Sequence, residues 1–231
     1  MFTHNLRLWI ESLKEGEIFF AKTAYDEYFE DAEEATFYQL IARLYKEGYL
    51  GKIAKGLYFR PYKDDKTKMP PIENIINFFT NKGKKGTLIG AYKFKELGLI
   101  DNPTGDYEIY TDCHDIKTVR KLNGFNVKQV KLDYRNDVVV TTLLMLEINE
   151  NIDNYEDVNV EALKAFIEKF VSIYKEDVLY KVLQAKSYKK RNLYLLSVIL
   201  NKYGVENHIS RYLNKASKYQ TSRYILEAIG E

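Results

Sequence analysis

The stretch "GYLGKIAKGLYFRPY", residues 48–62, consists of two short apolar arms joined by Lys-Gly at 55–56. Cationic side chains lie on both arms and at the tip, at Lys52, Lys55 and Arg60. Two apolar arms around a glycine-containing turn are typical of a two-stranded hairpin. The stretch therefore predicts a small hairpin with a cationic rim.

Three helices are expected ahead of this hairpin. Apolar residues at helical spacing indicate a first helix over 4–14, a second after the extended start of "EIFFAKTAYDEYF", and a third over about 32–47. Asp31 is suited to cap the third helix, and Gly48 is suited to end it. Three helices followed by a hairpin is the order of a winged helix-turn-helix, which predicts DNA binding by residues 1–62.

The third helix has an apolar face and a polar face, and the polar face supplies the candidate DNA contacts. On this helix we expect Thr36, Gln39 and Arg43 to contact base edges, with Lys46 beside them. On the hairpin, the wing of this fold, the predicted phosphate contacts are Lys52, Lys55 and Arg60.

The charge of the N-terminal part favours two other interpretations. Six carboxylates and no base lie between residues 26 and 34, and residues 1–62 hold eight bases against ten acids. An acidic surface repels DNA phosphates. A merely solvated polar face and a protein-interaction module are therefore the alternatives to DNA binding.

The rest of the chain divides at the polar, proline-bounded segment "PYKDDKTKMPP". Beyond it, "IENIINFFTNKG" and "AYKFKELGL" read as helices, and "GTLIG", "YEIYTD" and "FNVKQVKL" as strands. From residue 136 onward the pattern is helical, with helices expected over 138–150, 160–174, 177–186, 190–203 and 205–219. The predicted class is α+β, in the order winged helix (1–62), linker and start of a helix (63–74), small α/β unit (75–135) and helical region (136–231).

Signatures of catalysis and of cofactor binding are weak. Cys113 and His114 are adjacent in "TDCHD", so in a strand they point to opposite faces and form no nucleophile–base pair. The segment "GKKGT" lacks the order of a phosphate-binding loop, and neither His4 nor His208 has partners at metal-ligand spacing. We expect no enzyme activity, no cofactor and no metal. One cysteine, no signal peptide and no apolar run of membrane-spanning length predict a cytoplasmic protein.

Positive charge is concentrated near the C-terminus. Residues 181–223 hold ten bases against one acid, Glu206, and the bases alternate with tyrosines. Such a surface suits nucleic-acid phosphates or an acidic partner protein, and the alternative is a solvated face. The candidate partner residues are Lys189, Lys190, Arg191, Arg211, Lys215, Lys218 and Arg223.

Three segments resemble the AbiEi-like antitoxins of type IV, or abortive-infection, toxin–antitoxin systems. They are "LIARLYKEGYLGKIAKGLYFRP" at 40–61, the "PPIENII" that follows the linker, and "GAYKFKELGLIDNPTGDYEIYT" at 90–111. In the family these correspond to a helix with its wing, and then to a helix ending in Leu-Gly-Leu before a strand. The resemblance covers roughly residues 1–135 and extends to the rest in helical character only.

The resemblance implies two activities and two partners. The N-terminal domain would bind the promoter DNA of its own operon and repress it, and the C-terminal region would counter a nucleotidyltransferase-like toxin encoded beside it. Two alternatives stay open. One is a stand-alone transcription factor whose rear domain dimerises or binds a ligand, and the other is an enzyme that uses the basic C-terminal face as a nucleic-acid track.

Overall fold

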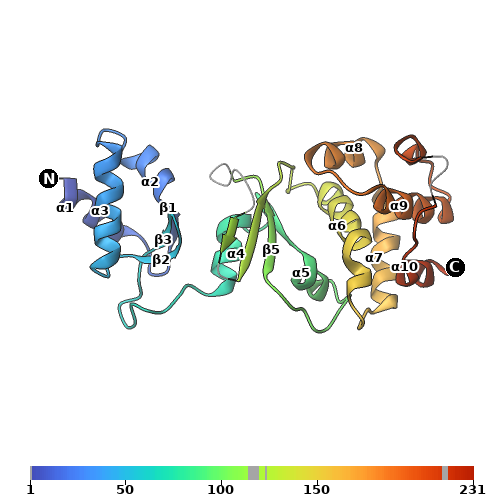
Figure 1. Cartoon of the computed structure of the whole chain (residues 1–231), viewed down its shortest axis with the longest axis horizontal. Coiled ribbons are helices and arrows are strands. Elements are labelled where there is room, and N and C mark those ends of the chain that lie inside the picture. The colour runs from blue at the N-terminus through green and yellow to red at the C-terminus, as the bar shows by residue number, and fades with distance from the viewer. Residues whose placement is uncertain (1, 114–119, 123, 215–217) are drawn as a thin grey trace.

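The computed structural model describes residues 2–113, 120–122, 124–214 and 218–231 of the 231, without the side chains of residues 120 and 121. The chain is α+β. Figure 1 shows three helices and a small sheet at the N-terminal end, a second sheet in the middle, and packed helices at the C-terminal end. The N-terminal part, up to residue 62, is called the head below, and the remainder the body.

The head has the expected winged-helix order, with one strand more than predicted. That strand, β1, pairs antiparallel with β3, which also pairs with β2, so the sheet order is β1-β3-β2. Gly48, with a φ of +73°, ends α3 in the left-handed conformation that favours glycine. The elements are α1 (Phe2–Ser12), β1 (Ile18–Phe20), α2 (Ala21–Tyr28), α3 (Glu34–Lys46), β2 (Gly51–Ala54) and β3 (Leu57–Phe59).

The small sheet is covered on both faces, because successive side chains of a strand alternate between them. Phe19 and Tyr58 pack with the helices of the head. Ile18, Phe20 and the apolar residues of β3 instead pack with helix α4 (Ile72–Thr80) of the body. The rings of Phe20 and Phe78 lie 5.2 Å apart, centroid to centroid. The head is therefore joined to the body by an apolar interface as well as by the linker.

The hairpin is tied to the start of α2 and packs against the body. Its tip is held down by a hydrogen bond of 2.9 Å from the amide of Ala21 to the carbonyl of Gly56. Ile53 and Ala54, on β2, are partly buried against the apolar interface with α4. Lys52 and Lys55 of the hairpin are exposed all the same, so the expectation that they contact phosphates beside the groove stays a prediction.

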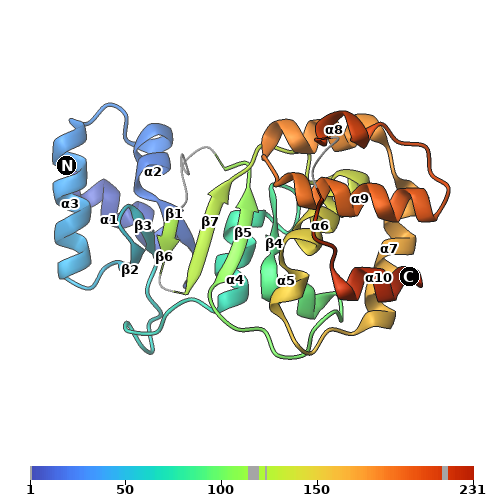
Figure 2. The same ribbon diagram turned by 45° about the vertical axis from the view of Figure 1, so that its right-hand side comes forward.

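The middle of the chain is a four-stranded sheet with helices on both faces. The strands run in the order β4-β5-β7-β6, and β5 and β7 are parallel (Figure 2). One face packs with α4 through Leu88, Ile109 and Val127, and the other contributes Ile89 and Tyr110 to the core of the C-terminal helices. The remaining elements of this part are β4 (Gly86–Ile89), α5 (Gly90–Glu96), β5 (Tyr107–Thr111), β6 (Arg120–Leu122) and β7 (Phe125–Gln129).

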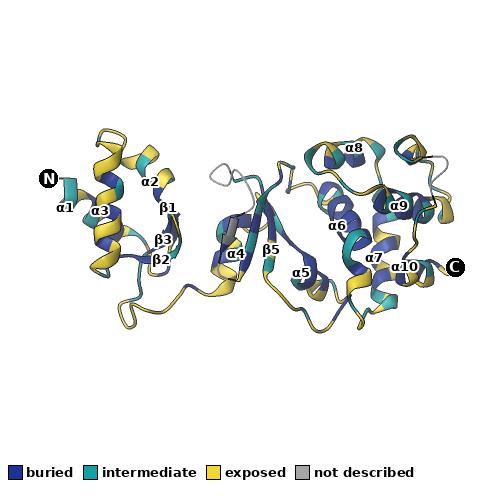
Figure 3. Cartoon of the chain, in the orientation of Figure 1, coloured by how far each residue is buried: buried dark blue, intermediate teal, exposed yellow. Residues whose placement is uncertain are grey.

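The C-terminal region is built around α6, which is buried along most of its length (Figure 3). The β-branched run "VVVTT" is helical, as predicted, because surrounding helices bury it and packing overrides its weak helix propensity. The helix predicted over 205–219 is wrong: the described part of that segment holds only a short 3-10 turn, Ile209–Tyr212. The helices are α6 (Asp137–Asn151), α7 (Val160–Ile173), α8 (Glu176–Ala185), α9 (Lys190–Lys202) and α10 (Arg223–Ile229), with a 3-10 turn at Ile152–Asn154.

Candidate nucleic-acid interface and C-terminal basic surface

Helix α3 presents the predicted DNA-contacting residues to solvent. Its buried side chains, Phe37, Leu40, Ile41 and Leu44, face the core of the head. The opposite side is exposed along the helix and is coloured yellow in Figure 3. It carries the four side chains predicted on this helix, namely Thr36, Gln39, Arg43 and Lys46.

The two ends of this exposed side differ in charge. At the N-terminal end lie Glu33 and Glu34, and the hydroxyl of Thr36 donates a hydrogen bond of 2.8 Å to the Glu33 carboxylate. At the C-terminal end the Lys52 ammonium lies 5.5 Å from the ring centroid of Tyr45. This places Lys52 of β2 beside the last turns of α3. The cationic part of the candidate interface is therefore the C-terminal half of α3 together with β2.

Arg60 has a structural role, which makes it a weaker candidate for the predicted phosphate contact than Lys52 or Lys55. Its guanidinium is half-buried and donates hydrogen bonds to the carbonyls of Glu11 and Leu13. Glu11 lies in the last turn of α1 and Leu13 directly follows the helix, where main-chain acceptors lack partners within the helix. Arg60 thus supplies hydrogen-bond donors to the main-chain carbonyls at the C-terminal end of α1. Lys55 is exposed at the tip of the hairpin, beside the contact that holds the tip down.

Sequence reasoning missed a further cation at the interface, Arg7 of α1. Its guanidinium lies 2.8 Å from the carboxylate of Glu47 and 4.7 Å from the ring centroid of Tyr49. Both partners lie just after α3, about 40 positions along the chain. A spacing pattern within one helix cannot reveal this contact.

The C-terminal basic surface keeps part of its predicted charge exposed. Lys189, Lys190, Lys218 and Arg223 are exposed, and the Lys190 ammonium donates a hydrogen bond of 2.5 Å to Asn214. The Arg223 guanidinium lies over the ring of Tyr224, 4.4 Å from its centroid. Lys215, also predicted here, lies outside the described residues.

Acidic residues from elsewhere in the sequence neutralise the other two predicted cations. Arg191 pairs with Asp153, and Arg211 pairs with Glu176 at 3.0 Å. Glu176 also accepts a hydrogen bond of 2.8 Å from the ring of His208, which lowers the pKa of Glu176 and raises that of His208. Asp153 and Glu176 both precede residues 181–223, so the exposed charge is smaller than that segment's composition implies.

A cluster of charged and hydroxyl groups lies below this surface. The Lys186 ammonium contacts Glu147 at 2.8 Å and Glu150 at 3.1 Å, and the hydroxyl of Tyr188 donates to Glu147 at 2.5 Å. The side chains of Lys186 and Glu147 are only 9% and 3% exposed. Two residues of the basic segment "KSYKKR" therefore point inward, and Lys189 and Lys190 remain outside.

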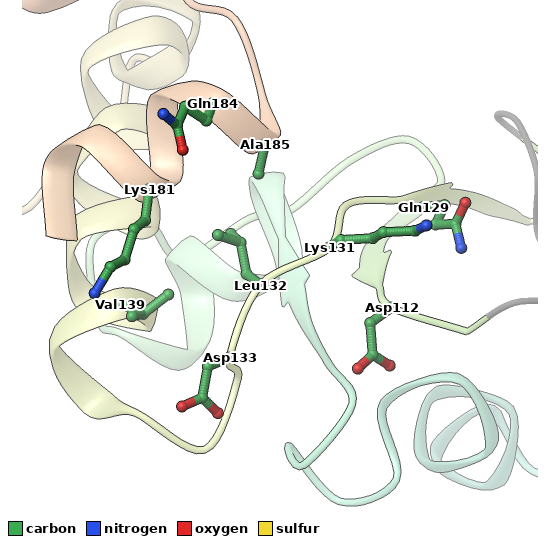
Figure 4. A pocket seen from close by; sticks show the side chains of 9 residues that line it. All are labelled: Asp112, Gln129, Lys131, Leu132, Asp133, Val139, Lys181, Gln184 and Ala185. Atoms are coloured by element: carbon green, nitrogen blue, oxygen red, sulfur yellow. The ribbon is translucent and has the colours of Figure 1, made fainter.

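An open hollow of about 900 Å³ lies between α8 and the segment that follows β7 (Figure 4). It is lined by side chains of both charges, among them Asp112, Lys131, Asp133 and Lys181.

Within the described residues, no three His, Cys, Asp or Glu side chains lie close enough together to hold a metal ion. His114 lies outside the described residues, so the expectation that Cys113 and His114 form no nucleophile–base pair stays a prediction.

None of the helices in the described part of the chain is both long enough and apolar enough to cross a membrane.

Comparison with models of known protein families and with curated proteins gives no match. Among solved structures, the chain is similar to the crystal structure of the RV2827C protein from Mycobacterium tuberculosis, with 13% sequence identity and a TM-score of 0.42. That similarity covers 88% of this chain and 76% of the other.

Proposed function

We propose that this chain is a DNA-binding regulator and antitoxin of a type IV toxin–antitoxin system. The head would bind promoter DNA of its own operon and repress it. The body would counter a nucleotidyltransferase-like toxin and would itself catalyse no reaction. The observation that carries the proposal is the winged-helix order of the head, with the polar side of α3 exposed and cationic at its C-terminal end. The family resemblance of the three quoted segments supports the antitoxin part.

Arg43 should be the strongest single determinant of specific DNA binding among the residues of α3. Its side chain is 55% exposed and its Nε lies 3.8 Å from Glu47, a loose pairing that lets the guanidinium reach a base edge. Arg43→Ala should weaken binding to DNA from upstream of the reading frame by about 1–3 kcal/mol, the range for a lost bidentate contact to guanine. Gel shifts at fixed salt measure this. Arg135→Ala removes an exposed arginine of the body and should leave the affinity unchanged.

The absence of any shift with the unaltered protein at low salt would remove the repressor half of the proposal. Equal losses for Arg43→Ala on upstream and scrambled duplexes would assign Arg43 to phosphate rather than to a base.

Antitoxin activity should depend on the exposed C-terminal cations. Arg191 is left out of the test, because it is paired with Asp153 and its reversal would break that ion pair. Reversing Lys189, Lys190 and Lys218 to glutamate should abolish the rescue of growth when the chain is co-expressed with the neighbouring toxin gene. Such exposed positions usually change stability by less than about 0.5 kcal/mol.

A matched control makes the same change of charge at three exposed lysines elsewhere on the body, Lys95, Lys164 and Lys175. This control should rescue growth fully. If the first variant also rescues, the C-terminal cations form a solvated face. If no nucleotidyltransferase gene lies next to the gene that encodes this chain, the alternative of a stand-alone regulator is favoured.

A further inference from the structure

Glu47 occupies an unfavourable position for an acid. It follows directly after α3 and forms the helix C-cap. The C-terminal end of a helix carries partial negative charge, so a carboxylate there is repelled. Helix stability therefore does not account for Glu47, and its side-chain partners supply the explanation.

Two arginines from different helices converge on this carboxylate. Arg7 of α1 lies 2.8 Å from one oxygen of Glu47, and the Nε of Arg43 lies 3.8 Å from the other. The side chains of Arg7 and Glu47 are 36% and 37% exposed, so the pair lies at the surface. The Nε of Arg7 is buried and donates no hydrogen bond within the described residues. Glu47 thus holds two cations while leaving part of their hydrogen-bonding capacity unused.

Further cations surround this contact. Lys46 precedes Glu47 on α3, and Lys52 lies over Tyr45 on the neighbouring strand. Lys66 of the linker passes close to Gly48, where an added Cβ would lie 3.9 Å from its Cδ. Only Arg7 and Arg43 pair with Glu47 among these cations. The α3 C-terminal surface consists of Arg7, Arg43, Lys46, Glu47, Tyr49, Lys52 and Lys66.

We propose that Arg7 belongs to the DNA-binding surface, and that a DNA phosphate displaces Glu47 as the partner of Arg7, which leaves Arg43 to reach a base edge. This inference rests on the proposed DNA binding by the head. A phosphate accepts paired hydrogen bonds from a guanidinium, as a carboxylate does, and brings further oxygens for the neighbouring lysines. Exposed ion pairs are weak, so Glu47 is a partner that phosphate can replace. Glu47 therefore keeps the cations ordered and opposes binding to nucleic acid.

The variant that tests the inference is Glu47→Gln, and its matched control is Glu34→Gln. Both remove one exposed negative charge from the same helix, and the two positions lie about 20 Å apart along its axis. With a labelled duplex from upstream of the reading frame, Glu47→Gln should bind about fivefold more tightly, because no carboxylate has to be displaced from Arg7. Glu34→Gln removes general repulsion of phosphates but frees no arginine, so its gain in affinity should be clearly smaller.

Arg7→Gln supplies the opposite change. It should weaken binding about fivefold, on its own and in the Glu47→Gln background, because Arg7 itself contacts the phosphate. Since the two variants move the affinity in opposite directions, partial unfolding of the head cannot produce both results.

The inference and the proposed function fail in different ways. If the unaltered protein binds the duplex while Glu47→Gln and Arg7→Gln leave its affinity unchanged, the inference is wrong and the proposed function stands. An equal gain for Glu34→Gln also overturns the inference, because the effect would then be one of total charge. If the unaltered protein binds neither the upstream nor a scrambled duplex at low salt, both are wrong.

Discussion

Replacing Lys186 by methionine should lower the free energy of unfolding by about 3–5 kcal/mol, because it leaves the buried Glu147 carboxylate without its cation. Methionine keeps most of the length of the side chain, so little cavity is created. Chemical denaturation measures the change. The control is Lys189→Met, three residues away on the exposed surface, which should change stability by less than about 0.5 kcal/mol.

A second substitution separates the loss of charge from the loss of packing. Glu147→Gln removes the buried charge and keeps an oxygen that can accept the hydrogen bond from Tyr188. Burial and the nearby Glu147 raise the pKa of Tyr188, so its hydroxyl keeps the proton that it donates. The double variant Glu147→Gln/Lys186→Met should therefore recover most of the lost stability. If Lys186→Met costs no more than Lys189→Met, the cluster contributes nothing measurable.

The position of this cluster explains the size of the expected effect. Glu147 and Glu150 belong to α6, and Lys186 and Tyr188 belong to the connection between α8 and α9. The Lys186 ammonium also lies 5.7 Å from the ring centroid of Tyr110 on β5. The cluster thus lies where the sheet meets the C-terminal helices, inside their shared core. The same residues anchor the turn that presents Lys189 and Lys190.

The winged-helix order could be predicted from the sequence because its signals are local. Helical spacing marks α3, Gly48 marks its end, and Lys-Gly at 55–56 marks the turn of the hairpin. The extended start of "EIFFAKTAYDEYF" was predicted, but its pairing with the hairpin as a third strand was not, because "IFF" lacks the alternation of a strand with one face in water. It has apolar residues in succession because both of its faces are covered, one by the head and the other by α4.

The error over 205–219 also has a local cause. Val205, Ile209 and Leu213 have helical spacing, but the polar residues between them favour turns. The side-chain oxygen of Asn207 accepts a hydrogen bond from the amide of Ile209, and this bond competes with the main-chain bonds of a helix. Ile209 is still buried. The apolar residue at this position therefore indicates a contact with the core and does not indicate a helix.

Residue types and segment charge predicted the candidate interfaces only in part. Thr36, Gln39, Arg43 and Lys46 are exposed on α3, as their spacing predicted. Arg60, Arg191 and Arg211 instead have partners 35 or more positions away in the chain. Net charge over a segment counts such cations as free. Only the fold shows which of them are already paired.

Removing the head should destabilise the body, although the two are joined by a single exposed linker. A chain of residues 63–231 lacks the Phe20 side chain and β3, and so exposes Phe79 and Ile75 of α4, which are 1% and 4% exposed in the whole chain. Burial of such a side chain contributes about 1.5–3 kcal/mol, so the loss should reach roughly 3–6 kcal/mol. The measurements are the denaturation midpoint and the binding of a dye that fluoresces on apolar surface.

A chain cut within the linker is the matched control, because it breaks the covalent connection and keeps the interface. Residues 63–69 are exposed, so a protease site placed there is accessible. After cleavage, head and body should still elute together on size exclusion and melt near the temperature of the intact chain. Separation of the cleaved halves, with an unchanged melting temperature for residues 63–231, would show that the α4 interface contributes no stability. The antitoxin role of the body could then be tested with that fragment, whereas a stabilising interface requires point variants in the whole chain.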